Sequence, residues 1–251
     1  MNLTSLGTSK APLVRFLYHV RNLRSKALFD VLQKYCKGQV LDIGGWDFYL
    51  TVRTKKISYD RWVILESDRK KMWELEDSKC QFIIGDGCHS SFENDTFDTV
   101  VSIQVLEHVF EPIRMFEEMV RLLKPGGFGV VMVPQTSNLH LAPEHFQNFT
   151  IYWLRQACRS NKVNIVEEKP LGGFWSTIAS RMFYFFLHST RRSGFSDPHV
   201  ERNMFFYLLF PLMSVWAMIN VVVCLFLSLG DLAEEPNNHL IVFQKPSGAT
   251  P

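Results

Sequence analysis

Short apolar segments alternate with helical segments along most of the chain, and this alternation restricts the fold more than any other feature. Strand-like runs lie at 39–43, 62–65, 82–84, 99–103, 128–133, 163–166 and 239–243. Helical spacing of apolar residues marks 11–36, 112–123 and 151–159. Strands separated by helices form a mostly parallel sheet with right-handed crossovers. The sequence therefore predicts an α/β fold.

Composition narrows the class of partner. Hydrophobic residues make up 47% and charged residues 21% of the 251 positions, as in folded domains. The net charge is +2, and no basic stripe with interleaved aromatic residues is present, so nucleic acid is not an expected partner. The five cysteines include no pair with the close spacing of a metal knuckle. This cysteine pattern favours a reducing compartment, and we expect no metal site.

Acidic residues and glycines stand where three predicted strands end. Ligands of open α/β sheets bind beyond the carboxyl ends of the strands. Asp42, Gly44 and Gly45 lie at the end of the first strand, Glu66 at the end of the second, and Asp86 and Gly87 at the end of the third. Glu66 lies 24 positions after Asp42, which is near the spacing of about 20 residues at which a carboxylate reaches the hydroxyls of a ribose. Taken singly, each feature is equally consistent with a tight turn or a surface acid.

Order and spacing together resemble a known family. Residues 40–134 are similar to class I S-adenosylmethionine-dependent methyltransferases of the type 11 family. The matching segments are Val40-Leu41-Asp42-Ile43-Gly44, Glu66, Gly85-Asp86, Phe97-Asp98, Leu106-Glu107-His108-Val109 and Leu123-Lys124-Pro125-Gly126-Gly127. The resemblance implies a Rossmann-like seven-stranded sheet with helices on both faces and an antiparallel last strand. It also implies S-adenosyl-L-methionine as the cofactor.

The resemblance assigns roles by position. Asp42, Gly44 and Gly45 would line the methionine end of the donor, and Glu66 would bind the ribose. Asp86 and Gly87 would bind the adenine, and the backbone of Gln104 would pass near the sulfonium. One departure stands out, because Trp46 and Phe48 occupy positions where the family has glycine. Side chains with a Cβ fit there when φ is negative, and the loop is then expected to take a different shape.

Proton transfer from an acceptor requires a base near the same edge. Histidine is the usual base near neutral pH. His108 lies in the motif after the fourth strand, and His140 and His145 lie in the loop after the fifth. Glu107 could orient a histidine or contact the acceptor. The catalytic candidates are therefore His108, Glu107 and His145, and the alternative for each histidine is an ordinary loop or capping role.

An apolar insertion interrupts the pattern between the sixth and seventh strands. The expected organisation is an N-terminal helix at 1–37, a methyltransferase core at 38–170, a helical insertion at 171–238 and a final strand and tail at 239–251. Within the insertion, 204–230 contains 27 residues without a charge, and about 20 suffice to span a bilayer. A single span is excluded if strands six and seven share one sheet. A hairpin lying in a membrane surface is expected, with a lid or a dimer surface as the alternatives.

These observations predict a methyltransferase that acts on a small or lipid-linked acceptor, with oxygen as the methylated atom. We expect the protein to be cytoplasmic and peripheral or monotopic on a membrane. The first alternative is a catalytically silent member of the fold that acts as a membrane-associated scaffold or binding module. A weaker alternative is an NAD(P)-dependent reductase. It is less favoured because such enzymes carry a G-x-G-x-x-G pattern after the first strand, and the third glycine is missing here.

Overall fold

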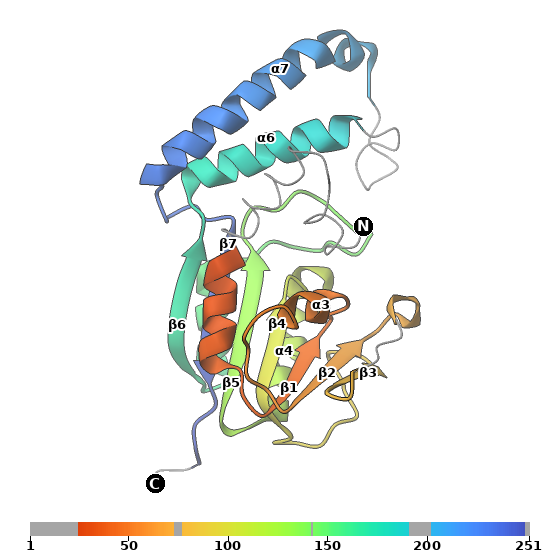
Figure 1. Ribbon diagram of the computed structural model, residues 1–251, viewed down its shortest axis with the longest axis vertical. Helices are drawn as coiled ribbons and strands as arrows, with labels where there is room; N and C mark the ends of the chain where they lie inside the picture. Colours follow the sequence, from red (N-terminus) through yellow and green to blue (C-terminus); the bar gives the residue numbers. More distant parts are fainter. Residues whose placement is uncertain (1–24, 73–76, 142, 191–201, 249–251) are drawn as a thin grey trace.

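The computed structural model describes residues 25–72, 77–141, 143–190 and 202–248. Seven strands form one sheet in the order β3-β2-β1-β4-β5-β7-β6 (Figure 1). β7 pairs antiparallel with β5 and β6, and the pairs among β1 to β5 are parallel. The strands are β1 Gln39–Ile43, β2 Arg61–Glu66, β3 Cys80–Ile84, β4 Phe97–Ile103, β5 Leu123–Pro134, β6 Asn164–Leu171 and β7 Asn238–Gln244. The predicted fold class is confirmed.

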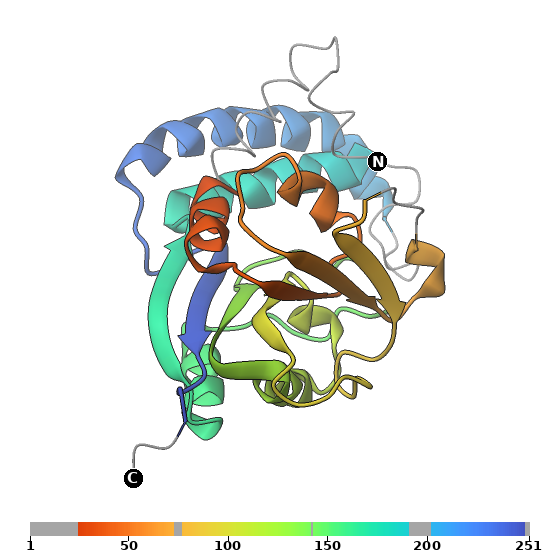
Figure 2. The ribbon, with the colours of Figure 1, turned by 60° about the horizontal axis from the view of Figure 1, so that its bottom comes forward.

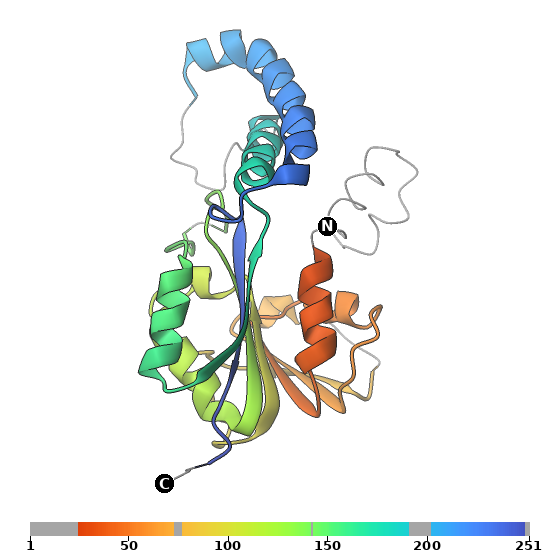
Figure 3. The same ribbon diagram turned by 90° about the vertical axis from the view of Figure 1, so that its left-hand side faces the viewer.

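Helices cover both faces of this sheet (Figure 3). A helix at 25–35 and α3 (Phe48–Val52) lie on one face, and α4 (Pro112–Leu122) and α5 (Ile151–Ser160) lie on the other. The earlier part of the predicted N-terminal helix, 11–24, falls outside the described residues. The remaining elements are η1 Arg69–Lys71, η2 Leu106–His108, α6 Phe174–Thr190, α7 Met204–Leu227 and η3 Ser228–Gly230.

Strand residues alternate between two hydrophobic cores, as the two-residue period of a strand requires. Leu41 and Ile43 point into the core beneath α4 and α5. Val40 points to the opposite core, beneath the helix at 25–35. Both cores are buried, so the central strands are apolar on both faces, as in other parallel sheets.

β5 and β6 extend furthest beyond the apolar runs that predicted them. β5 begins at Leu123 because its first residues already pair with Phe97. β6 continues to Leu171, although its sequence contains three charged residues, because the ladder with β7 extends to the pair Leu171 and Asn238. Hydrogen bonding to a neighbour extends these strands beyond their hydrophobic segments. The insertion therefore begins after Leu171 and ends before Asn238.

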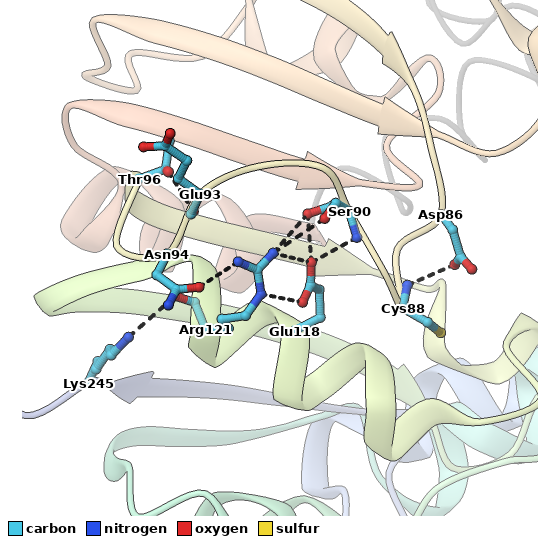
Figure 4. A network of polar contacts seen from close by, with 9 residues as sticks. All are labelled: Asp86, Cys88, Ser90, Glu93, Asn94, Thr96, Glu118, Arg121 and Lys245. Carbon is cyan, nitrogen blue, oxygen red and sulfur yellow. Dashed lines mark hydrogen bonds and ion pairs between the residues drawn. The ribbon is translucent and has the colours of Figure 1, made fainter.

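A polar network holds the connection between β3 and β4 against α4 (Figure 4). Arg121 donates from Nε and Nη2 to the two oxygens of Glu118, each at 2.7 Å. Glu118 Oε1 also accepts from the backbone nitrogen (2.8 Å) and the hydroxyl (2.6 Å) of Ser90. Arg121 Nη1 reaches Asn94 Oδ1 at 2.6 Å. Because Glu118 is buried, the network holds the segment after β3 firmly against α4.

The insertion forms a helical hairpin above the carboxyl ends of the strands (Figures 1 and 2). α6 and α7 pack side by side, and α7 forms the outer layer (Figure 1). α7 continues through Pro211 and curves (Figure 3), so the proline does not break the helix. The carboxylate of Asp231 accepts from the backbone nitrogens of Trp175 (2.7 Å) and Ser176 (3.1 Å) at the start of α6. This contact ties the two ends of the hairpin together.

Candidate active site

The turn after β1 brings the chain close to two neighbouring segments. The Gly44 N–H donates to Leu65 O at 2.8 Å, which joins the ends of β1 and β2. Gly44 has φ +70°, and a Cβ there would lie 2.7 Å from Cγ1 of Val105. A Cβ on Gly45 would collide with the Asp42 carboxylate. Both positions therefore require glycine.

Asp42 lies behind this turn with its side chain fully buried. The indole nitrogen of Trp62 donates to Oδ2 at 3.2 Å, whereas Oδ1 has no hydrogen-bond partner among the described residues. Burial raises the pKa of Asp42 to about 8; the Trp62 hydrogen bond acts in the opposite direction, and the charge of Glu66 adds to the increase. A carboxyl group with this environment is suited to a positively charged or hydrogen-donating neighbour.

The structure corrects the expectation for Trp46. This residue has φ +36°, whereas the sequence interpretation required a negative angle. The turn keeps the left-handed backbone that glycine adopts easily, and a bulky side chain there costs about 1–2 kcal/mol. Phe48 instead begins α3, and its ring stacks on Phe29 with centroids 6.0 Å apart.

Glu66 ends β2 in a buried position beside this turn. Its Oε1 accepts from the backbone nitrogen of Ser67 at 3.1 Å and from Lys71 Nζ at 3.3 Å. Its Oε2 is buried and has no partner within the part of the chain that the structure describes. One oxygen thus fixes the side chain, and the other is a free acceptor at the edge of the sheet. The sequence interpretation did not predict that Lys71 contacts this site. The sequence feature that could have indicated it is Asp68, which caps the start of the short helix η1 that carries Lys71.

Asp86 and Gly87 follow β3 at the same edge. Asp86 is exposed, and its Oδ1 accepts from the backbone nitrogen of Cys88 at 2.8 Å. A Cβ on Gly87 would lie 2.7 Å from Cγ2 of Ile43, so this loop runs close to the end of β1. The Glu118 network holds the same segment, as Figure 4 shows.

Gln104 directly follows β4 and has a backbone conformation that is uncommon for its residue type. It has φ +58°, and its N–H donates to Met132 O at 2.8 Å. Its side chain donates to Asn238 Oδ1 at 3.0 Å. Strained backbone of this kind is frequent where a ligand passes close to the chain.

Three histidines from two separate segments of the chain meet at this edge. His108 in η2 and His140 and His145 in the loop after β5 form a group that we call the histidine cluster. Ring centroids are 4.7 Å apart for His108 and His140, 4.5 Å for His140 and His145, and 5.5 Å for His108 and His145. Burial lowers the pKa of His108 and of His145. The structure thus brings together the three bases that the sequence predicted.

Glu107 adjoins the histidine cluster next to His108. Its side chain is fully buried, and neither carboxylate oxygen accepts a hydrogen bond among the described residues. Oε1 lies 3.9 Å from His108 Nε2. Burial raises the pKa of Glu107 to about 8.

The core of the chain matches a protein family directly. Residues 63–131, from β2 into β5, match the type 11 methyltransferase domain. The chain carries a type 11 methyltransferase domain. Over 82 residues it is 28% identical to norajmaline N-methyltransferase of Rauvolfia serpentina. That match covers 33% of the chain and 28% of the plant enzyme, so the chain spans less than a third of this curated relative.

Solved structures share the fold of the methyltransferase domain. A chain of the complex between the Haloferax volcanii methyltransferase activator Trm112 and a methyltransferase superposes with a TM-score of 0.58 and 16% identity, covering 90% of this chain and 91% of that one. Phosphoethanolamine N-methyltransferase 2 of Haemonchus contortus, solved with S-adenosyl-L-methionine, gives a TM-score of 0.54 and 16% identity. The second match covers 90% of this chain and 52% of that enzyme.

One link between the methyltransferase domain and the hairpin was not predicted. Arg181 of α6 donates from Nη1 to Asn138 Oδ1 at 2.7 Å. Asn138 belongs to the loop that carries His140 and His145. The only sequence signal was Arg181 itself, a charge within an otherwise apolar run. The hairpin therefore contacts the loop of the histidine cluster.

Proposed function

We propose that this chain transfers a methyl group from S-adenosyl-L-methionine to a hydroxyl of a lipid-linked or small acceptor. The observation that carries this proposal is the free, buried oxygen of Glu66 at the end of β2, beside the Gly44-Gly45 turn. A carboxylate in this position accepts hydrogen bonds from a ribose, as its place in a methyltransferase domain leads us to expect.

The surrounding residues fit the rest of the donor. Asp42 Oδ1 is a second buried oxygen without a partner, and it lies behind the glycine turn that would face the methionine end. We assign the adenine to Asp86 and Gly87, and the backbone near the sulfonium to Gln104. When bound, the donor supplies a methyl group already activated by its positive sulfur. The protein's task is then to position the acceptor and to remove its proton.

The histidine cluster is our candidate for proton removal. A hydroxyl must lose its proton on methylation, and a histidine within hydrogen-bond reach accepts it. We assign the role of base to His108, which lies next to Glu107, and His145 packs against the His108 ring. We assign the acceptor to the space near these side chains.

The hairpin supports a lipid-linked acceptor. The most apolar 18-residue window within Met204–Gly230 has a mean hydropathy of 2.3, and only 11% of that window is buried. Leu208, Leu212 and Ile219 are each more than half exposed, although burying such a side chain stabilises by about 1.5–3 kcal/mol. Only Ala217, Val221 and Cys224 of α7 are buried in the described structure. A lipid surface would cover the remaining faces of α7.

The paired strands constrain how α7 could meet that surface. β6 and β7 lie side by side, so both ends of the hairpin are on one side of any bilayer. We therefore propose that α7 lies in the membrane surface rather than crossing it, and that the protein is peripheral or monotopic on the cytoplasmic face. The contact between Arg181 and Asn138 then connects the membrane layer with the loop of the histidine cluster.

Calorimetric titration with S-adenosylhomocysteine tests the donor half. We expect micromolar binding that weakens at least about tenfold in Glu66→Gln, because a charged hydrogen bond contributes about 1.5–3 kcal/mol. Glu117→Gln, an exposed change on α4, is the matched control and should bind as the wild type does. A folded protein that binds no S-adenosylhomocysteine would contradict the proposal and favour the scaffold alternative.

Flotation tests the membrane half. We expect wild-type protein to float without detergent with vesicles of phosphatidylcholine and phosphatidylglycerol. Leu212→Glu with Ile219→Glu places two charges on one face of α7 and should leave the protein in the bottom fraction. Tyr152→Glu, an exposed aromatic position on α5, should still float. Wild-type protein that stays at the bottom and elutes as a dimer would assign α7 to a second copy of the chain instead.

Nitrogen is the second candidate acceptor atom, since two of the similar enzymes are named N-methyltransferases. Incubation with tritiated donor and a panel of lipid-linked alcohols and amines distinguishes the two. Label transferred to amines alone would contradict methylation on oxygen.

A further inference from the structure

The histidine cluster and Glu107 place three side-chain ligands around one point. His108 Nε2 and His140 Nε2 lie 3.1 Å apart, and Glu107 Oε1 lies 3.9 Å from His108 Nε2. One potential ligand atom from each residue lies within 4.8 Å of the other two. Two of these residues come from the turn after β4, and the third comes from the loop after β5.

Backbone carbonyls fix the orientation of both rings. The Nδ1–H of His108 donates to Glu144 O at 2.6 Å. The Nδ1–H of His140 donates to Asn138 O at 2.8 Å. A carbonyl oxygen can only accept, so in each ring the proton resides on Nδ1. In the neutral rings, both Nε2 atoms therefore carry lone pairs, and the two atoms lie 3.1 Å apart.

Two lone pairs at this distance repel each other unless a cation lies between them. Glu107 adds a second imbalance, because its buried carboxylate accepts no hydrogen bond within the described chain. A buried carboxyl group without a hydrogen-bond partner is costly in the interior of a protein, whether it is charged or neutral. A single metal ion would satisfy both nitrogens and the carboxylate.

We propose that Glu107, His108 and His140 bind a divalent transition-metal ion, with zinc as the best fit. Two imidazoles and one carboxylate are a zinc ligand set that leaves one position open. Bonds of about 2.0–2.1 Å in a tetrahedron separate ligand atoms by about 3.3 Å, close to the 3.1 Å between the two nitrogens. The backbone carbonyls that accept from Nδ1 are the usual outer partners of histidine ligands.

His145 packs beside this site without joining it. Its Nδ1 accepts from the backbone nitrogen of His140 at 3.2 Å, and its Nε2 faces the Ser137 hydroxyl at 3.3 Å. Both ring nitrogens are therefore already in use. His145 holds the loop in the shape that presents His140.

The open position suggests what the ion does. A hydroxyl bound to a divalent cation loses its proton more easily, and the ion would take over the proton-releasing role that otherwise falls to a histidine. This role rests on the proposed function, whereas metal binding does not. The sequence interpretation expected no metal because it considered cysteine spacing, and this ligand set contains no cysteine.

Metal-free protein, prepared by dialysis against chelator, is titrated with Zn²⁺ by calorimetry. We expect one ion per chain, with affinity reduced at least about a hundredfold in His140→Ala and in Glu107→Gln. The exposed His89→Ala should bind as the wild type does. Co²⁺ loading should give visible absorption of a tetrahedral ion without a thiolate charge-transfer band, which excludes the cysteines.

A folded protein that binds no stoichiometric Zn²⁺, or whose affinity is unchanged in His140→Ala, overturns the proposal. If no stoichiometric Zn²⁺ binds, the close approach of His108 and His140 would instead be explained by a proton shared between their Nε2 atoms. Titration of the same preparation with S-adenosylhomocysteine separates the two proposals: donor binding without metal binding refutes the metal site alone.

Discussion

Replacing Asp42 with asparagine should change how the stability of the protein depends on pH. Folding raises the pKa of this carboxyl from 3.8 to about 8, chiefly through burial. The folded chain thus retains a proton that the unfolded chain releases, so the group's contribution to stability is full below pH 4 and is lost as pH rises towards 8. Each pH unit in this window costs about 1.4 kcal/mol. Between pH 5.5 and 7.5, wild-type protein should lose about 3 kcal/mol relative to Asp42→Asn.

Urea unfolding of both proteins at the two pH values measures this difference, in ligand-free buffer of constant ionic strength. Asparagine resembles the protonated carboxyl in size and cannot titrate, so contributions from all other groups cancel in the comparison. Asp60→Asn, at an exposed position, is the control and should show no such change. If the stability difference between wild type and Asp42→Asn is the same at both pH values, then Asp42 is ionised in the folded protein and the reasoning fails.

Three further predictions concern the framework of the site. Gly45→Ala should lower stability by about 1–3 kcal/mol, because the new Cβ collides with the Asp42 carboxylate. Adding Asp42→Ala should recover part of this loss, and urea unfolding of the single and double variants measures the coupling energy between the two positions. Glu118→Gln should cost about 1–3 kcal/mol, because it weakens the buried pair with Arg121, whereas an effect equal to that of Glu117→Gln would contradict the role of the network. Asp231→Ala should cost about 1–2 kcal/mol by uncapping α6. Burial opposes ionisation of Asp231, but hydrogen bonds from Ser176 and Trp175 outweigh it and lower its pKa. This cost should therefore decline as pH falls below about 4 and be lost once pH passes below the folded pKa, in acid-unfolding curves.

The sheet was predictable because its central strands are buried on both faces and are therefore apolar throughout. The ends of β6 were not, since Glu167, Glu168 and Lys169 belong to the strand only through its pairing with β7. Positions of the acidic residues and glycines at the strand ends followed from topology. The left-handed angle of Trp46 did not, because a residue type does not reveal the backbone imposed by its neighbours.

The histidine cluster shows the same division. Sequence reasoning placed all three rings at one edge, since the carboxyl ends of parallel strands lie together. It could not show that His108 and His140, 32 positions apart, face each other through Nε2. That detail depends on the carbonyls of Asn138 and Glu144, which belong to an irregular loop with no periodic signal.

The register of the last two strands has a consequence for the history of the chain. Leu171 and Asn238 are directly opposite partners in the ladder, so the polypeptide leaves the sheet and returns to it at neighbouring points. Antiparallel partners are about 5 Å apart, a gap that a two-residue turn closes. A short turn could therefore take the place of the hairpin while β6 and β7 keep their register, so an ancestor could have acquired the hairpin in a single genetic event and gained with it the contact between Arg181 and Asn138.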